Sequence, residues 1–79
     1  METTLNQLHE GQCARILSLR MRGAMRRRLL DFGMIEGTRV RCLRKSPSGD
    51  PVIYSVRGTM LALRRQDSGR IAVEVEACP

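Results

Sequence analysis

Turn-forming segments divide this chain into short apolar stretches, and this division limits what it can fold into. Glycine or proline marks each break: Gly11, the pair Gly33 and Gly37, the loop 46–51, Gly58 and the segment 66–69. None of the stretches between these breaks approaches the ~18 apolar residues that a membrane-spanning helix needs. We therefore expect short strands with little helix, arranged around one small core.

Most of these stretches have the pattern of a strand. Residues 13–19 are apolar around a β-branched centre, and residues 38–46 alternate Arg39 and Arg41 with Val40 and Cys42. The stretches 52–57, 59–65 and 71–76 follow, and the last one alternates valine with glutamate. A period of two predicts strands with one buried and one exposed face. The sequence therefore predicts five strands.

One stretch has a helical pattern instead. Met25, Leu29 and Phe32 fall on one narrow face at about 100° per residue, whereas Arg26 and Arg27 face away from it. Gly33 follows at the position where helices most often end. We expect a helix over residues 23–32, with Met25, Leu29 and Phe32 against the core and the arginines on its exposed side.

Five strands and one helix in 79 residues predict a mainly β fold, a small closed or nearly closed barrel. An α+β two-layer fold is the alternative. We expect a single domain over residues 1–79, in which residues 1–4 form a loose tail.

The charge favours an anionic partner without identifying it. The net charge is +6, and Lys45 is the only lysine among 14 basic residues. A small barrel that binds nucleic acid usually stacks bases on two or more exposed aromatic side chains. Here only Tyr54 is a candidate, so we favour a protein-facing basic surface and keep nucleic-acid binding as the alternative.

The cysteines and the histidine give little support for a metal site. Cys13, Cys42 and Cys78 are far apart, and their odd number without a secretory leader favours a reducing, cytoplasmic location with unpaired thiols. His9, Glu10 and Cys13 are weak metal candidates, because Gly11 argues against the helix that would align them. Cys78 could join them only if the tail folds back. We expect no cofactor, although weak binding of a transition metal stays open.

No constellation of catalytic residues is present. His9 is the only histidine, and the aspartates lie in turns or at a helix end, where they make local hydrogen bonds. The sequence therefore predicts a binding protein, not an enzyme.

Several short motifs occur together in a recognisable order. They are Arg28-Leu29, Phe32-Gly33, Gly37-Thr38, Gly49-Asp50-Pro51 and Arg57-Gly58. From about Leu5 to Val75 the chain resembles the ferrous-iron transport protein A (FeoA) family. The residues that carry the resemblance as fold-defining positions are Arg28, Leu29, Gly33, Gly37, Asp50, Pro51 and Gly58.

The resemblance implies an SH3-like barrel with a short inserted helix. It also implies a small cytosolic protein that regulates or helps assemble the membrane ferrous-iron transporter FeoB through contact with its GTP-binding part. A metal-bridged oligomer is a further alternative. Candidate partner-binding residues are Arg22, Arg26, Arg27, Leu30 and Tyr54.

Overall fold

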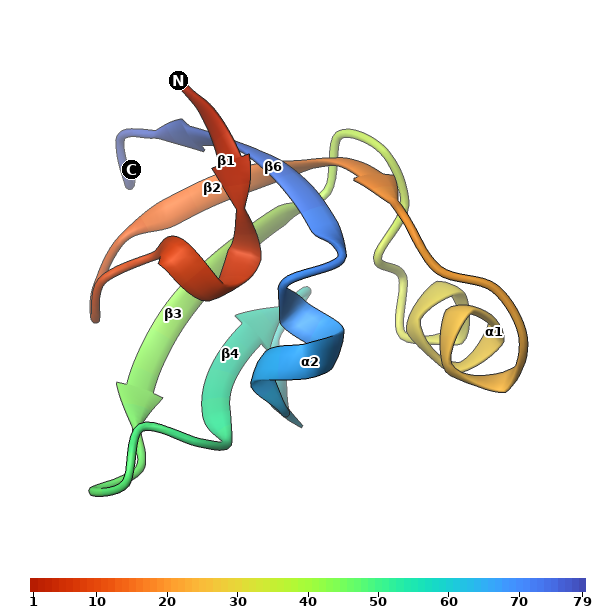
Figure 1. Cartoon of the computed structure of the whole chain (residues 1–79). Coiled ribbons are helices and arrows are strands. Elements are labelled where there is room, and N and C mark those ends of the chain that lie inside the picture. The colour runs from red at the N-terminus through yellow and green to blue at the C-terminus, as the bar shows by residue number, and fades with distance from the viewer.

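Six strands form one antiparallel sheet in the computed structural model, which describes residues 1–79. The strand order is β1-β6-β2-β3-β4-β5, and the sheet curls around the core (Figure 1). The strands are β1 (Glu2–Thr4), β2 (Cys13–Leu19), β3 (Arg39–Lys45), β4 (Val52–Val56), β5 (Thr59–Leu63) and β6 (Ile71–Glu76). The helical elements are a 3₁₀ turn, η1 (Leu5–Gln7), and the helices α1 (Ala24–Asp31) and α2 (Arg65–Ser68). The prediction of a mainly β fold with a short helix after the strand 13–19 is confirmed, although the sheet has six strands and not five.

The additional strand is β1, so the prediction of a loose tail over residues 1–4 is wrong. Thr3 and Thr4 lie opposite Val73 and Ala72 of β6. The Val75 amide also donates to the Met1 carbonyl oxygen at 3.0 Å. One edge of β6 is paired with β2, and β1 provides hydrogen-bond partners for the backbone groups of its other edge. Three residues are too few to show a period of two, which is why the pattern did not reveal this strand.

The core is aliphatic, as expected, but it also contains the only tyrosine. Tyr54 is 1% exposed, and its hydroxyl group donates to the Leu5 carbonyl oxygen at 3.5 Å. Burial raises the pKa of Tyr54 to about 12. Tyr54 takes the inward position between Val52 and Val56 in β4, as a period of two requires. It is therefore not available for a partner or a base, and its assignment as a partner-binding residue is wrong.

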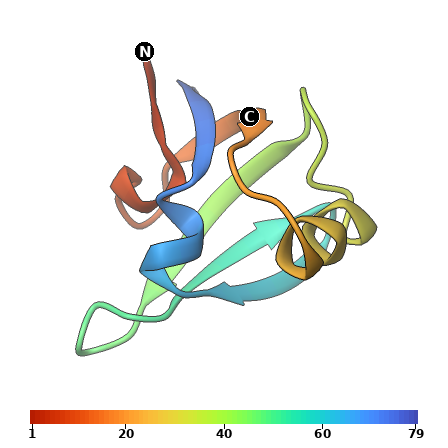
Figure 2. The same cartoon turned by 45° about the vertical axis from the view of Figure 1, so that its right-hand side comes forward.

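Helix α1 ends within one residue of its predicted end. The Gly33 amide donates to the Leu30 carbonyl oxygen, and Gly33 has a φ of 91°. A left-handed residue just past the last turn is a common helix stop, and glycine adopts it without a steric penalty. Figures 1 and 2 show α1 at one side of the sheet, between the end of β2 and the start of β3.

The segment between β5 and β6, for which the sequence allows a turn or a single helical turn, forms the single-turn helix α2. The carboxylate of Asp50 accepts a hydrogen bond from the Arg65 amide at 2.9 Å, which satisfies one of the free donors at the start of α2. Asp50 thus joins the β3–β4 loop to α2. Neither α1 nor α2 has the length and apolar character that crossing a lipid bilayer requires.

Two of the three cysteines form a disulfide, so the prediction of unpaired thiols is wrong. Cys13 at the start of β2 is bonded to Cys78, whose segment folds back beside it. Cys42 alone is free, and it is buried in the core. Burial raises the pKa of the Cys42 thiol, which keeps the sulfur protonated and unreactive.

Candidate functional site

Helix α1 is attached to the barrel by a narrow apolar stripe. Leu29 is its only fully buried residue, and Met25 is half-buried. On both sides of this stripe the helix leaves an open cleft against the sheet. A helix held this way presents most of its surface to the outside, so the surface around α1 is a candidate partner site.

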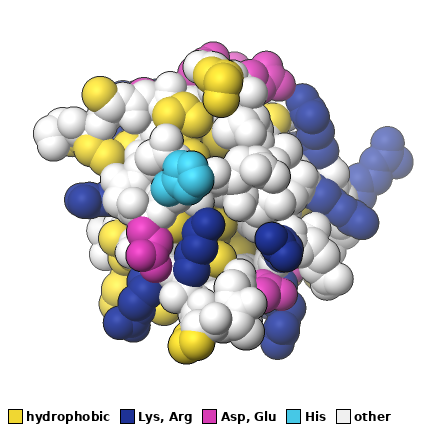
Figure 3. Space-filling view, turned by 60° about the vertical axis from the view of Figure 1, so that its left-hand side comes forward, with side chains coloured by type: hydrophobic (Ala, Val, Ile, Leu, Met, Phe, Trp, Pro, Cys, Tyr) yellow, Lys and Arg dark blue, Asp and Glu magenta, His cyan; other side chains and the backbone are white.

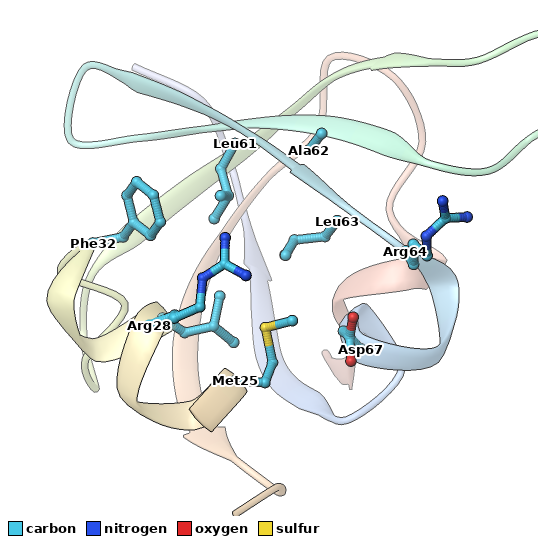
Figure 4. A pocket seen from close by; sticks show the side chains of 9 residues that line it. Met25, Arg28, Phe32, Leu61, Ala62, Leu63, Arg64 and Asp67 are labelled. Atoms are coloured by element: carbon cyan, nitrogen blue, oxygen red, sulfur yellow. The ribbon is translucent and has the colours of Figure 1, made fainter. Parts of the chain in front are cut away.

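The first cleft lies between α1 and β5 and has a volume of ≈ 280 Å³. Figure 4 shows Met25, Arg28 and Phe32 of the helix side across from Leu61 and Leu63. The three residues predicted to share a face, Met25, Leu29 and Phe32, all line it. The burial of Phe32 was predicted wrongly, because β5 does not close over the cleft and 37% of the side chain is exposed.

The second cleft lies between α1 and β2 and has a volume of ≈ 240 Å³. Arg26 lines it and donates from Nη1 to the Leu19 carbonyl oxygen at 2.7 Å, which ties the helix to the end of β2. Leu30 and Ile35 also line it, and they are 39% and 50% exposed. Two partly exposed branched side chains beside a guanidinium group suit a protein contact, where arginine and apolar groups are enriched.

The structure brings together two of the five predicted partner-binding residues, Arg26 and Leu30, and leaves Arg22 and Arg27 exposed. Arg26 and Leu30 share the second cleft, whereas Arg22 and Arg27 are exposed and form no ion pair within the chain. Sequence patterns missed Phe32 and Ile35, because an apolar residue near a helix end is normally expected to be buried. We call the following set the α1 surface: Arg22, Arg26, Arg27, Leu30, Phe32 and Ile35.

The weak metal candidates do not converge on a common point. His9 is exposed, and Figure 3 shows the histidine on a face where Lys and Arg side chains are more prominent than acidic ones. The Glu10 carboxylate accepts from the Lys45 amide at 2.7 Å, and the Cys13 sulfur is bonded to Cys78. No three side chains of the His, Cys, Asp or Glu types lie close enough to hold a metal ion together.

Comparison with known proteins identifies the family. The FeoA domain model matches residues 3–75, which is nearly the whole chain. The chain belongs to the FeoA family. This family is associated with ferrous-iron transport, and the expectation drawn from the sequence motifs is confirmed.

Solved structures agree with this assignment. FeoA from Chlorobium tepidum is 35% identical, with a TM-score of 0.90 over 95% of this chain and 71% of that one. FeoA from Stenotrophomonas maltophilia, solved as a zinc complex and described as a prokaryotic SH3 domain protein, is 32% identical. Its TM-score is 0.82 over 91% of this chain and 89% of that one. The SH3-like fold is thereby confirmed.

A curated relative carries the same domain within a much larger polypeptide. The fusion protein of Fe(2+) transport protein A and the Fe(2+) transporter FeoB from Porphyromonas gingivalis is 35% identical over 71 residues. The match covers 90% of this chain and 8% of the fusion protein. In that organism a FeoA domain and a FeoB transporter are therefore held together covalently.

Proposed function

We propose that this chain is an accessory protein of a bacterial ferrous-iron uptake system and acts by contact with a FeoB-type membrane transporter. The observation that carries the proposal is the Porphyromonas gingivalis fusion protein, in which the matching domain and the transporter are one polypeptide. Covalent linkage holds two domains at a high effective concentration for each other, which favours contact between them. The GTP-binding part of the transporter is the contact that we favour.

The α1 surface is the part of this contact that the geometry supports. It combines exposed apolar side chains with arginines that have no acidic partner of their own. Two clefts beside the helix can accept side chains from the partner. Such a surface binds through its apolar centre and is oriented by its charges.

Nucleic-acid binding is less well supported than before, because Tyr54 lies in the core and offers no stacking surface. A metal-bridged oligomer has no cluster of ligands within the chain to support it. Neither alternative has a specific observation in its favour.

The proposal is tested by titrating the chain into the detergent-solubilised transporter of the same organism. Arg22→Glu/Arg27→Glu reverses two exposed charges on the α1 surface, and Leu30→Glu places a charge in its apolar part. Arg65→Glu/Arg70→Glu is the matched control, because both residues are exposed and lie outside this surface. We expect saturable binding of the natural sequence, weakened by roughly ten-fold or more in the two α1 variants and much less in the control. Absence of binding by the natural sequence would overturn the proposal.

A further inference from the structure

A second cleft-bearing surface lies on the outer face of β3 and β4, away from the core. It has a volume of ≈ 370 Å³ and is lined by Arg39, Arg41, Ser55 and Arg57, together with Thr38, the Cys13–Cys78 disulfide and Pro79. Arg41 pairs with Ser55 in the sheet, and Arg57, in the turn that follows β4, lines the same cleft as Arg39. Neighbouring positions on one face of a sheet lie about 4.5–8 Å apart, within reach of long side chains. We call Arg39, Arg41, Ser55 and Arg57 the arginine face.

One arginine of this face, Arg39, is already paired with a carboxylate of the chain, that of Glu76. Glu76 accepts from Arg39 Nε at 2.6 Å and from Arg15 Nε at 2.8 Å, so a single carboxylate bridges two guanidinium groups. The hydrogen bond from Arg39, and then that from Arg15, lowers the pKa of Glu76 against the opposing effect of partial burial. Arg41 and Arg57 have no such partner in the chain. Arg41 and Arg57 are therefore a second pair of arginines, and no carboxylate of this chain bridges them.

The backbone conformation at Arg57 indicates that its side chain has a function beyond forming the turn. Arg57 and Gly58 are the central residues of the two-residue β4–β5 turn, with φ values of 52° and 82°. Such turns favour Asn-Gly, because asparagine tolerates positive φ better than arginine does. Arg57 is the only residue other than glycine in this chain with a positive φ. Residues held in a sparsely populated conformation cluster at functional sites.

Arg57 also connects the arginine face to the end of helix α1. A Cβ atom added at Gly33 would lie 2.6 Å from Arg57 Cδ and 3.3 Å from Arg57 Nε, so the arginine stem passes directly over this glycine. The Thr38 hydroxyl, which lines the same cleft, donates to the Gly33 carbonyl oxygen at 2.9 Å. The arginine face is therefore continuous with the end of α1.

We propose that the arginine face binds an acidic segment of the partner protein, with one Asp or Glu carboxylate bridging Arg41 and Arg57 as Glu76 bridges Arg15 and Arg39. Charge complementarity favours this occupant, because four arginines here (Arg15, Arg39, Arg41, Arg57) share one carboxylate. Met60 lies opposite Ser55 and is 72% exposed, which adds an apolar anchor beside the charges. The identity of the partner as the transporter rests on the proposed function.

The first arm of the test needs no transporter. The chain, labelled with ¹⁵N arginine, is titrated with the peptide Ac-Glu-Glu-Leu-Glu-Glu-NH₂ while the Nε–H signals of the arginines are followed by NMR. The proposal requires saturable shifts at Arg41 and Arg57 that are larger than at Arg65 and Arg70. Calorimetric titration should show the affinity for the peptide falling by roughly ten-fold or more in Arg41→Gln/Arg57→Gln, in which these two signals are absent, and unchanged in Arg65→Gln/Arg70→Gln. Equal small shifts at all arginines would overturn the proposal, as would binding of a single-stranded RNA oligonucleotide but not of the peptide.

The second arm uses the solubilised transporter and the variant Arg57→Asn. Asparagine suits the turn, so we expect an equal or higher melting temperature together with binding weakened by roughly ten-fold. A lower melting temperature with undiminished binding would show that Arg57 serves the fold and would overturn the proposal. If the peptide binds at Arg41 and Arg57 but the natural chain does not bind the transporter, the proposed function fails while the acidic-segment site stands. If the transporter binds the natural chain and Arg41→Gln/Arg57→Gln equally well, the acidic-segment site fails while the proposed function stands.

Discussion

Gly33 and Arg57 are in contact: the arginine stem crosses the glycine at a distance that leaves no space for a Cβ atom. Gly33 ends helix α1 and Arg57 begins the β4–β5 turn, so two turns far apart in the sequence meet in the fold. Both residues belong to motifs by which the sequence resembles the FeoA family. The contact therefore brings the Phe32-Gly33 and Arg57-Gly58 motifs together in space, and it joins the α1 surface to the arginine face.

This contact makes Gly33→Ala informative about stability. Alanine at a φ of 91° costs roughly 1–2 kcal/mol in any surroundings, and at this position the methyl group must also displace Arg57. Gly49→Ala is the matched control, because Gly49 has a φ of 88° and nothing within 4 Å of its added Cβ. Urea unfolding should show a greater loss for Gly33→Ala than for Gly49→Ala. Equal losses would mean that the Arg57 side chain moves aside at no measurable cost.

Two adjacent leucines of α1 should separate folding from binding. Leu29 is 1% exposed and Leu30 is 39% exposed. Leu29→Ala should lower the free energy of unfolding by about 2–5 kcal/mol, because it leaves a cavity in the core. Leu30→Ala should change it by only about 0.5 kcal/mol. Leu30→Ala should nevertheless weaken binding to the transporter, as measured by titration of each folded variant. A Leu30→Ala chain that unfolds as readily as Leu29→Ala would contradict the description of α1.

The ion pairs of Glu76 should make stability depend on acid pH. Because Arg39 and Arg15 lower the pKa of Glu76 below its ordinary value of 4.5, the folded state binds this proton less readily than the unfolded state does. The contribution of Glu76 is therefore complete above its unfolded-state pKa and disappears as pH falls through the lower folded-state pKa. Glu76→Gln should melt below the natural chain at neutral pH, and the two should converge as the pH falls below about 4. A difference in melting temperature that persists unchanged at low pH would exclude this electrostatic origin.

The disulfide should stabilise the fold, and Cys42 should report on it. Cys13 and Cys78 are separated by 65 residues, so their bond restricts a long segment of the unfolded chain. We expect Cys13→Ser/Cys78→Ser to lower the free energy of unfolding by roughly 2–4 kcal/mol.

The free thiol of Cys42 is buried and should react with iodoacetamide only when the chain opens. Its alkylation in the presence of mild urea should be faster in Cys13→Ser/Cys78→Ser than in the natural sequence. Equal alkylation rates would indicate that the disulfide does not contribute to stability.

The long, periodic elements could be predicted from the sequence, and the exceptions have physical causes. The alternation of arginine with Val40 and Cys42 gave β3 its two faces, and Gly33 marked the end of α1. By contrast, β1 is too short to show a period, and only the fold brings Cys78 to Cys13. The exposure of Phe32 depends on where β5 lies, which no local pattern contains. The burial of Tyr54 could have been predicted, because it shares the inward face of β4 with Val52 and Val56.

The candidate site was only partly visible in the sequence for a similar reason. Helical periodicity placed Arg26 and Arg27 on the outer side of α1, and both side chains are exposed. The arginine face combines residues of β3, β4 and the β4–β5 turn, so it depends on how two strands pair. Register is set by the buried faces and by the turns, and a sequence pattern does not supply it.

The most direct test of the account is a titration of the chain into the solubilised FeoB-type transporter in physiological salt, with and without guanine nucleotide. If the chain is an accessory protein that contacts the GTP-binding part, binding saturates at a defined stoichiometry and its affinity changes with the bound nucleotide. Saturable binding that does not depend on the nucleotide would support the accessory role but not a contact that senses the nucleotide state. Absence of saturable binding in every nucleotide state would contradict the central claim.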